Sequence, residues 1–538
     1  MTDPIATLDE TVARASAEMH AGDGAPEASF ERPPKPEFGD YSTNAALLLA
    51  PLLGEQPRIV AERLGELLLA SAGAGLDRVE VAGPGFLNLF LADDWFRDAA
   101  DAINVAGVGF GAGVAEARSE RTLVEFVSAN PTGPVTVASG RHAAYGDSLA
   151  RILEFAGHTV EREYYMNDAG GQIRLFGESI AARISGAEIP EGGYQGSYVT
   201  DLAEQLAEEG ITATEGEQLA RRGVELMRES IEASLGRFRV HFDTWFSERS
   251  LHESGAIEEG IEVVRAGGMT YESEGALWMR STDLGDDKDR VIRRGDGQPT
   301  YLASDIAYHR DKLERGHERL IDVLGADHHG YIARLQAVIA ALGGSVDHFE
   351  VLIMQLVQIL ERGERSKMSK RQGEFVRLDE LLDDIGVDAA RFFLLQRSHE
   401  TPIDLDLELA RKRSNDNPVY YVQYAHARIC NIFRRAEAGA GEVDEAVEPG
   451  LRPAERALIS RLLELPAQVE RAERRREPHG LSAYAREVAA DFHAFYRDCP
   501  VVKAPEPLRG QRLAACDATR TVIATVLGLL GIEAPEEM

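Results

Sequence analysis

This sequence of 538 residues has few cysteines, few lysines and no long apolar run, and each shortage excludes a class of protein. The three cysteines, Cys430, Cys499 and Cys516, are widely spaced, so they suit neither a disulfide framework nor a zinc ligand set. No run of about 18 apolar residues occurs, which argues against a membrane-spanning helix. Residues 1–10 carry no basic and apolar leader, which argues against secretion. Together these absences predict a protein of the reducing cytoplasm.

Acidic residues outnumber basic residues by 90 to 58, which gives a formal net charge of −32. A charge of this sign argues against a protein that coats nucleic acid without selectivity. It does not exclude a nucleic-acid partner, because arginines cluster locally, as at residues 411–413 and 474–476. A solvated helix face explains each cluster when it is taken alone.

Lysine is rare in the chain, and two of its seven lysines fall in Lys367-Met368-Ser369-Lys370. A lysine ammonium is a compact charge on a flexible stem, which suits it to follow a phosphate that moves. The motif therefore predicts that Lys367 and Lys370 stabilise a polyphosphate as it leaves. The alternative is a solvated basic loop.

Hydrophobic periodicity divides the chain into three regions. Residues 1–105 mix helical spacing with short apolar runs, which predicts an α+β domain. Residues 118–405 alternate strand-like and helical patterns around a mainly helical insertion at about 166–240, which predicts an α/β domain. The strand-like runs disappear after about residue 405, so we expect 406–538 to be all-α. Residues 107–113 are interpreted as a linker, because their glycine spacing does not fit a dinucleotide-binding loop.

The α/β region opens with a predicted strand–loop–helix–strand unit. Thr122–Val127 has the composition of a strand, and a loop rich in proline and glycine follows at Asn130–Pro134. The helix after it ends at Gly157, and Val160–Tyr165 is a second predicted strand. The loop then lies at the carboxyl end of a parallel strand, where open sheets bind ligands. Further strands are predicted at Thr300–Ser304, Leu320–Leu324 and Val351–Leu356, with a helix at Ile332–Leu342.

A series of short sequence blocks spans nearly the whole chain, and their order is as informative as their content. The blocks are residues 38–44, 82–86, 128–134, 164–170, 285–290, 325–330, 388–391 and 417–424. Taken together they resemble the arginyl-tRNA synthetase family of class I aminoacyl-tRNA synthetases. The resemblance implies an α/β fold: a Rossmann-type parallel-sheet catalytic domain between an N-terminal α+β tRNA-binding domain and a C-terminal all-α anticodon-binding domain.

The resemblance implies ATP-dependent ligation of L-arginine to tRNA(Arg) through an arginyl-adenylate, with transfer to the terminal adenosine ribose. Mg²⁺ should accompany ATP, and we expect no tightly bound cofactor and a monomer. We also expect no metal site in the protein, because the adjacent His328 and His329 would point apart and no third ligand lies nearby. The residues implied to bind ATP are Pro131, Thr132, Gly133, Pro134, Thr136, Ser139, Met368, Ser369 and Lys370, with Lys367, Lys370, Thr136 and Ser139 as the catalytic groups. Those implied to bind arginine are Ser128, Asn130, Glu248, Tyr301, Asp305 and His328, and those implied to bind tRNA are Asn44, Tyr420 and Tyr424.

One departure from the family concerns its first ATP motif, which has a His-x-Gly-His core. Here those positions hold Thr136, Val137, Ala138 and Ser139, so both imidazoles are missing. Hydroxyl groups also donate hydrogen bonds to phosphate, but charge-assisted bonds are about twice as strong. A catalytically inert paralogue that binds tRNA is therefore an alternative, as is a class I synthetase for another amino acid.

Local structure offers a second explanation for several of these residues. Asp305 could instead be the N-cap of the helix that follows it, and Asn130 could begin a turn before proline. Tyr420 and Tyr424 would share a helix face, where they could stack on unpaired bases or pack against neighbouring helices. Glu125 is either a buried pocket carboxylate or an edge charge.

Overall fold

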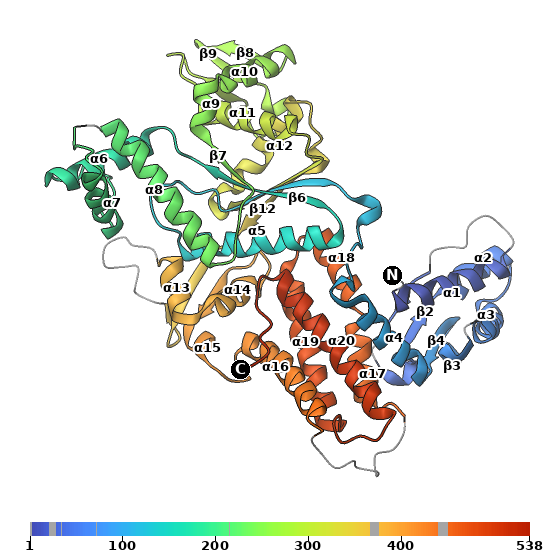
Figure 1. The fold of residues 1–538 in the computed structure, drawn as a ribbon. Helices are drawn as coiled ribbons and strands as arrows, with labels where there is room; N and C mark the ends of the chain where they lie inside the picture. The colour runs from blue at the N-terminus through green and yellow to red at the C-terminus, as the bar shows by residue number, and fades with distance from the viewer. Residues whose placement is uncertain are drawn as a thin grey trace.

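The computed structural model describes residues 3–20, 28–33, 35–71, 73–214, 216–365, 376–439 and 450–538. These residues form an N-terminal unit, a central α/β unit and a C-terminal helical unit (Figure 1). The predicted fold class is confirmed, because the central unit holds a parallel sheet, the first unit mixes helices with strands, and the last is helical. No helix among the described residues is both long enough and apolar enough to cross a membrane.

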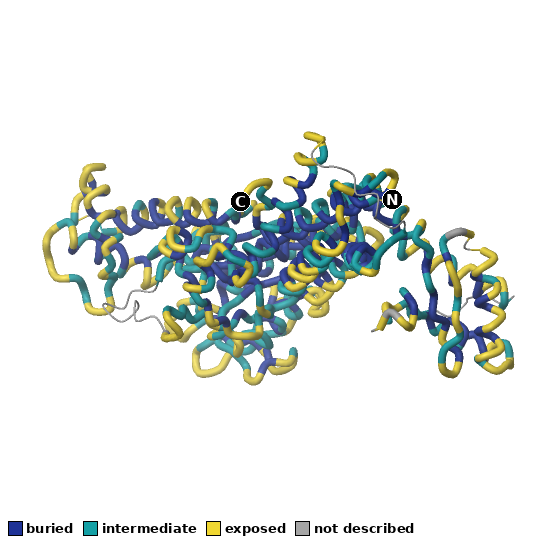
Figure 2. The backbone as a smooth tube through the Cα atoms, turned by 90° about the horizontal axis from the view of Figure 1, so that it is seen from below, coloured by how far each residue is buried: buried dark blue, intermediate teal, exposed yellow. Residues whose placement is uncertain are grey.

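The N-terminal unit is an antiparallel sheet of order β1-β2-β4-β3 packed against helices. Leu87, Leu89 and Leu91 alternate along β4 and are buried, as expected for one face of a strand. Figure 2 shows buried segments within this unit, and its buried residues belong to the same hydrophobic cluster as those of the central and helical units. Its elements are α1 (Pro4–Met19), β1 (Phe30–Glu31), β2 (Tyr41–Thr43), α2 (Ala45–Leu53), α3 (Pro57–Ser71), β3 (Leu76–Ala82), β4 (Phe86–Leu91) and α4 (Asp93–Ala106).

The central unit is built on a parallel sheet of order β12-β11-β5-β6-β7. Strand β5 pairs on one side with β6, which follows it in the chain, and on the other with β11, which comes much later. The strand order therefore reverses at β5, and ligands bind outside the carboxyl ends of the strands at such a point. The strands are β5 (Arg121–Glu125), β6 (Thr159–Met166), β7 (Thr244–Ser247), β11 (Arg319–Gly325) and β12 (Phe349–Met354).

Helix α5 (Val137–Ala156) crosses from β5 to β6 and lies very close to the sheet. A Cβ atom at Gly146 would lie 2.1 Å from the ring of Phe126, so only glycine permits this approach. The helix ends at Gly157, whose φ of 113° suits glycine. The amino end of α5 therefore sits at the carboxyl edge of the sheet, beside the loop that follows β5.

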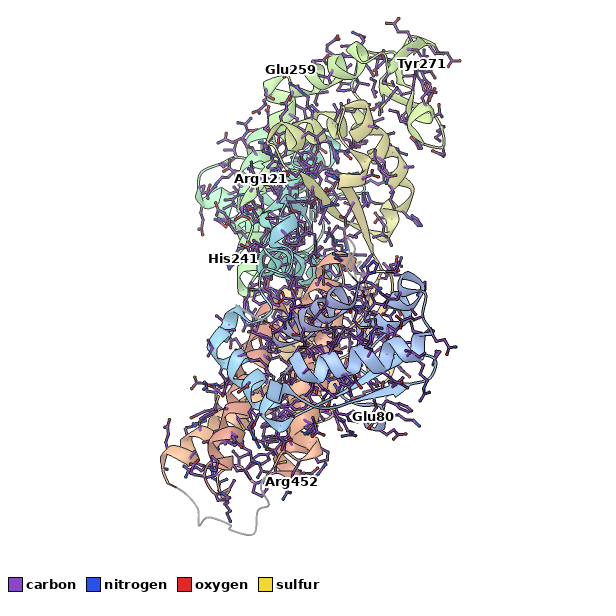
Figure 3. All side chains as sticks on the ribbon, turned by 90° about the vertical axis from the view of Figure 1, so that its right-hand side faces the viewer. Glu80, Arg121, His241, Glu259, Tyr271 and Arg452 are labelled. Atoms are coloured by element: carbon purple, nitrogen blue, oxygen red, sulfur yellow. The ribbon has the colours of Figure 1, made fainter. Side chains whose placement is uncertain are left out.

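Two insertions extend the central unit. The first follows β6 and is helical; the second follows β7 and contains an antiparallel sheet of order β10-β9-β8. Figure 3 shows Glu259 and Tyr271 of the second insertion at one end of the molecule, far from Arg452 of the helical unit. The elements are α6 (Gly171–Ser185), α7 (Ser197–Glu208), α8 (Gly216–Arg237), α9 (Glu248–Ser254), α10 (Ala256–Ala266), β8 (Thr270–Ser273), β9 (Ala276–Met279) and β10 (Arg290–Arg293).

The strand predicted at Thr300–Ser304 is wrong. The segment instead opens helix α11 (Tyr301–Glu314), which is followed after β11 by α12 (Ile332–Ala341). Buried side chains recur one turn apart along α11, as Leu302 and Ile306 do, which is the spacing of one helix face. A window of five residues contains too little of that period to separate a helix from a strand.

A smaller sheet and short helices join the central unit to the helical unit. In this sheet β13 pairs with β15 in parallel and with β14 antiparallel. The connecting elements are β13 (Val357–Glu361), β14 (Glu364–Arg365), α13 (Leu378–Ile385), α14 (Val387–Leu395), β15 (Ile403–Asp406) and α15 (Leu407–Arg411). The helical unit contains α16 (Pro418–Glu437), α17 (Pro453–Leu462), α18 (Leu465–Arg475), α19 (Pro478–Asp498) and α20 (Leu508–Leu529).

Arg391 on α14 is fully buried and binds the units together. Its guanidinium donates to Asp147 on α5 at 2.6 Å, to the carbonyl oxygen of Phe238 at 3.0 Å and to that of Leu530 at 2.7 Å. These partners belong to α5, to the end of the first insertion and to the end of α20. The helical unit is therefore attached directly to the helix that begins at the carboxyl edge of the sheet.

Candidate functional site at the carboxyl edge of the sheet

The loop that follows β5 is held against β6 in a strained backbone conformation. Val127 and Ser128 have φ values of 71° and 39°, a region that residues other than glycine rarely adopt. The hydroxyl oxygen of Ser128 accepts a hydrogen bond from the backbone N–H of Tyr165 at 3.2 Å. The Tyr164 hydroxyl donates to the carbonyl oxygen of Ala129 at 3.1 Å. Strain and tethering of this kind are typical of a functional site.

A cavity of about 550 Å³ lies beside this loop, at the amino end of α5. Its volume is typical of a small-molecule site. Five of the residues predicted to bind ATP line it, together with Asn130, whereas Pro131 and Ser128 do not. Those five are Thr132, Gly133, Pro134, Thr136 and Ser139.

The lysine motif, Lys367, Met368, Ser369 and Lys370, lies outside the described residues. Its assignment to ATP therefore stays a prediction from the sequence. The described chain resumes at residue 376, and Arg377 lines the same cavity as Thr136 and Ser139.

Thr136 and Ser139 form the amino-terminal cap of α5. The hydroxyl oxygen of Thr136 accepts from the backbone N–H of Ser139 at 3.2 Å, and the two hydroxyl oxygens are 3.1 Å apart. Whichever hydroxyl accepts in that pair keeps its own proton for another partner. The positive end of the dipole of α5 lies at the same point, so the cavity offers neutral donors suited to an anion.

Asp305 on α11 and Glu248 at the start of α9 are carboxylates that lack a strong cationic partner. Burial raises the pKa of Asp305 to about 6, and the charge of Glu248 raises it further, while His309 and Arg334 act in the opposite direction. Burial also raises the pKa of Glu248. Among the described residues, the one ion-pair partner of Glu248 within 4.0 Å is His252, at 3.9 Å, and Asp305 has none.

Glu248 helps to line a second cavity, of about 420 Å³, together with Tyr301 and Ser304. Tyr301 is 73% exposed, so its ring stands at the opening. Asp305 follows Ser304 in α11 but does not itself line the cavity. The alternative in which Asp305 caps a helix is wrong, because α11 begins at Tyr301 and Asp305 lies inside it.

A buried ion network lies further along α11. The ammonium of Lys312 is fully buried, 2.5 Å from Glu125 on β5 and 2.8 Å from Asp322 on β11. Burial alone would lower the pKa of Lys312, but the charges of Asp322 and Glu125 outweigh it and raise that pKa. The Tyr308 hydroxyl donates to Glu125 at 2.9 Å. The open question about Glu125 is thereby answered: it is a buried carboxylate that anchors α11, and with it Asp305, to the sheet.

His328 lies in a short 3₁₀ helix, Ala326–Tyr331, that follows β11. Its side chain is 45% exposed, with Nε2 3.5 Å from Asp327. A second histidine, His142 on α5, approaches the same loop. A Cβ atom added to Gly325 would lie 3.8 Å from the Cε1 atom of His142. Burial, with a contribution from the charge of Arg141, lowers the pKa of His142 to about 4, so it is neutral at pH 7. His142 could not be singled out from the sequence, where its one distinguishing feature is its place one turn after Ser139.

The tyrosines predicted to bind tRNA lie together on α16. The rings of Tyr420 and Tyr424 are stacked, with centroids 6.0 Å apart and an interplanar angle of 12°. Arg428 donates to the Tyr424 hydroxyl at 2.7 Å and lies 4.5 Å from its ring centroid. Tyr424 and Arg428 line a cavity of about 470 Å³ together with Tyr496, so this surface combines aromatic faces with positive charge.

The third residue predicted to bind tRNA, Asn44, lies before α2 in the N-terminal unit. Its side-chain oxygen accepts a hydrogen bond from the backbone N–H of Ser29 at 2.7 Å. That oxygen is therefore already used within the fold. No group of three or more histidine, cysteine, aspartate or glutamate side chains suited to hold a metal ion occurs in the part of the chain that the structure describes.

Sequence models of protein families match most of the chain in three consecutive segments. The model described as the arginyl tRNA synthetase N terminal domain matches residues 6–91. The class I (R) tRNA synthetase catalytic domain matches residues 108–404, and the DALR anticodon binding domain matches residues 422–538. The site above falls within the second of these segments.

Individual relatives match along nearly their whole length. The arginine–tRNA ligase of Symbiobacterium thermophilum is 43% identical over 548 residues, covering 99% of this chain and 98% of the relative. The arginine–tRNA ligase of Frankia alni is 46% identical over 528 residues, covering 95% of this chain and 94% of the relative. Among solved structures, the arginyl-tRNA synthetase of Thermus thermophilus has a TM-score of 0.75 at 24% identity, covering 99% of this chain and 100% of the other, which shows a shared fold.

Proposed function

We propose that this chain, which belongs to the arginyl-tRNA synthetase family, uses ATP to activate L-arginine and then transfers it to tRNA(Arg). The observation that carries the proposal is the pair of carboxylates, Asp305 and Glu248, whose charges act on each other and which have no Lys or Arg within 4.0 Å among the described residues. A guanidinium can satisfy such carboxylates with charge-assisted, bidentate hydrogen bonds. A ligand without that group would leave them buried and unpaired, so the pocket favours arginine.

In the first step, we propose that the arginine carboxylate attacks the α-phosphate of ATP in line and releases pyrophosphate. The protein forms no covalent bond in this step, so it acts by positioning the reactants and by stabilising charge. Ser128 and Asn130 would hold the α-amino group, with His328 near the carboxylate. Thr136 and Ser139 would donate to ATP phosphates from the amino end of α5, and the loop Pro131–Pro134 would lie against the nucleotide.

Lys367 and Lys370 are proposed to bind the pyrophosphate as it leaves. Met368 and Ser369, which lie between them in the sequence, are proposed to contact ATP. Mg²⁺ would enter with ATP as part of the nucleotide substrate. In the second step, a ribose hydroxyl of the terminal adenosine attacks the arginyl-adenylate and releases AMP. We expect Lys370→Ala to lower arginine activation strongly while leaving tRNA affinity nearly unchanged.

The tRNA is proposed to bind along the helical unit. Tyr420 and Tyr424 would stack on unpaired anticodon bases, a recognised mode for single-stranded RNA. Arg428 would add positive charge beside those rings, which matters on a chain whose net charge is −32. Asn44 would contact tRNA through its amide nitrogen, because its oxygen already accepts from Ser29. A monomeric state and a cytoplasmic location stay predictions.

Two assays test the proposed function. ATP–pyrophosphate exchange with arginine, measured with and without tRNA(Arg), should give exchange that depends on tRNA, as the family implies. Charging assays with each of the twenty amino acids should give arginyl-tRNA alone. Absence of exchange under both conditions would support an inert paralogue, and preference for another amino acid would refute the assignment to arginine.

A further inference from the structure

The cavity at the amino end of α5 has an unusual charge distribution. Among the described residues that line it, Arg377 is the one charged side chain, and no carboxylate lines it. The rest of the lining is apolar or neutral and polar, including Thr136 and Ser139. A polyphosphate that enters this cavity would carry several negative charges into a protein of net charge −32. Arg377 is thus the group in the described lining that can meet that charge directly.

The backbone around Arg377 is fixed against the start of α5. Thr136 and Arg377 form an antiparallel bridge. The backbone N–H of Val137 donates to the carbonyl oxygen of Val376 at 3.0 Å, and that of Leu378 donates to Val135 at 2.8 Å. Residues 376–378 and 135–137 therefore form one small ladder. Arg377 is consequently held opposite Thr136, although the two residues are far apart in the sequence.

The guanidinium of Arg377 has donors to spare. Its one hydrogen bond in the described part of the chain runs to the Ser197 hydroxyl, at 3.2 Å, and no carboxylate lies within 4.0 Å of it. Arg141, on the neighbouring α5, is different, because its guanidinium donates to three backbone carbonyl oxygens and is buried. An arginine with five donors and one hydrogen bond at a cavity can still form a bidentate contact with phosphate.

Other groups near α5 do not supply this charge. The two terminal nitrogens of Arg141 donate to backbone carbonyl oxygens, and Arg141 does not line the cavity. The His142 imidazole is neutral at pH 7 and approaches Gly325 instead. The hydroxyl groups of Thr136 and Ser139 are neutral at any ordinary pH.

We infer that Arg377 binds the phosphates of ATP and supplies, from the segment paired with the start of α5, the positive charge that Thr136 and Ser139 cannot. This inference rests on the proposed function, because it takes ATP to be the occupant of the cavity. Arg377 is then a catalytic residue in the strict sense, since it touches the reacting nucleotide. The ladder between 135–137 and 376–378 places it before the nucleotide arrives, so little reorganisation is needed.

The test compares Arg377→Gln with Arg237→Gln in the full-length protein. Arg237 is an exposed arginine that pairs with Asp379 and Asp383 on α13, so its removal takes the same charge from the same region without touching the cavity. In ATP–pyrophosphate exchange with tRNA present, Arg377→Gln should lower kcat/KM for ATP about 100-fold. The affinities for arginine and tRNA should stay within about twofold of wild type. Arg237→Gln should behave as wild type throughout.

A binding measurement and a rescue separate this role from a structural one. Affinity for a non-hydrolysable ATP analogue, measured by calorimetry, should fall in Arg377→Gln and fall less in Arg377→Lys, which keeps the charge. Adding Thr136→His and Ser139→His to Arg377→Gln should recover at least about tenfold of the loss, since imidazoles restore donors that can be charged.

Three results would overturn the inference: unchanged kcat/KM for ATP, equal losses for ATP, arginine and tRNA, or no recovery with the two histidines. If wild type charges tRNA with arginine and Arg377→Gln does so with an unchanged kcat/KM for ATP, the inference alone fails. If wild type gives no exchange with any amino acid, the proposed function fails and the inference falls with it.

Discussion

The proposed contact between Asp305 and the arginine guanidinium predicts that arginine binding depends on pH. Burial raises its pKa to about 6, and the nearby charge of Glu248 adds to the shift. The proposed guanidinium contact requires the anionic form of Asp305. Below pH 6 the free protein carries a proton there, which arginine must displace. Affinity should therefore be full above about pH 7 and should fall as the pH drops through the pKa of the free protein.

The size of the effect follows from that pKa. For one carboxyl group with a pKa of about 6, the apparent dissociation constant rises about tenfold between pH 7.5 and pH 5. A tenfold change corresponds to about 1.4 kcal/mol of binding free energy. Burial raises the pKa of Glu248 as well, so its protonation would add to the loss at the acidic end.

Calorimetric titration of the protein with arginine, from pH 5 to pH 8, measures this dependence directly. Asp305→Asn should bind arginine weakly and show a shallower pH profile, which isolates the contribution of Asp305. Citrulline, which replaces the guanidinium with a neutral group, should bind weakly and lack the acid-side loss. An arginine affinity that is the same at pH 5 and pH 7.5 would refute the reasoning, because it would mean that Asp305 does not meet the guanidinium.

Three further predictions concern stability and tRNA. Lys312→Met leaves Glu125 and Asp322 buried without their shared cation, so it should lower the free energy of unfolding in urea titrations by about 3–5 kcal/mol. The control Lys503→Met, at an exposed position, should change that free energy by less than about 0.5 kcal/mol. Asp305→Asn should raise Tm at pH 7.5 but hardly at pH 4, because a carboxyl pKa raised on folding from 3.8 to about 6 costs stability that develops between these two values and is full above about pH 6; equal shifts at both pH values would contradict this. Tyr424→Ala should weaken tRNA binding about 5- to 100-fold in filter-binding assays without affecting arginine affinity, and unchanged binding would remove the stacking role.

Sequence reasoning located the loop at Asn130–Pro134 and the fold class correctly, because these depend on local signals. Proline, glycine and a strand-like run are properties of adjacent residues, and a parallel sheet follows from their alternation. The strand predicted at Thr300–Ser304 failed for the same reason, since five residues do not show which period continues beyond them. The role of Glu125 could not be read either, because its partners lie on α11 and β11.

The candidate site was only half visible in the sequence. The individual residues Glu248 and Asp305 could be named, but their mutual repulsion depends on α9 and α11 packing side by side. His142 and Arg377 gave no usable signal. His142 becomes part of the site through its approach to Gly325, and Arg377 through its backbone bridge to Thr136. Both contacts join segments from opposite halves of the α/β unit.

By itself the sequence determined which functional groups are present: acidic side chains that suit a guanidinium, hydroxyl groups in place of the two imidazoles, and two of the few lysines in one short motif. The tertiary structure decided which of these groups lie in contact, which are buried, and which have hydrogen-bond donors left for a ligand. The physical reason is that a side chain's charge and pKa respond to neighbours within a few ångströms, and those neighbours are set by the packing of helices on the sheet rather than by order along the chain.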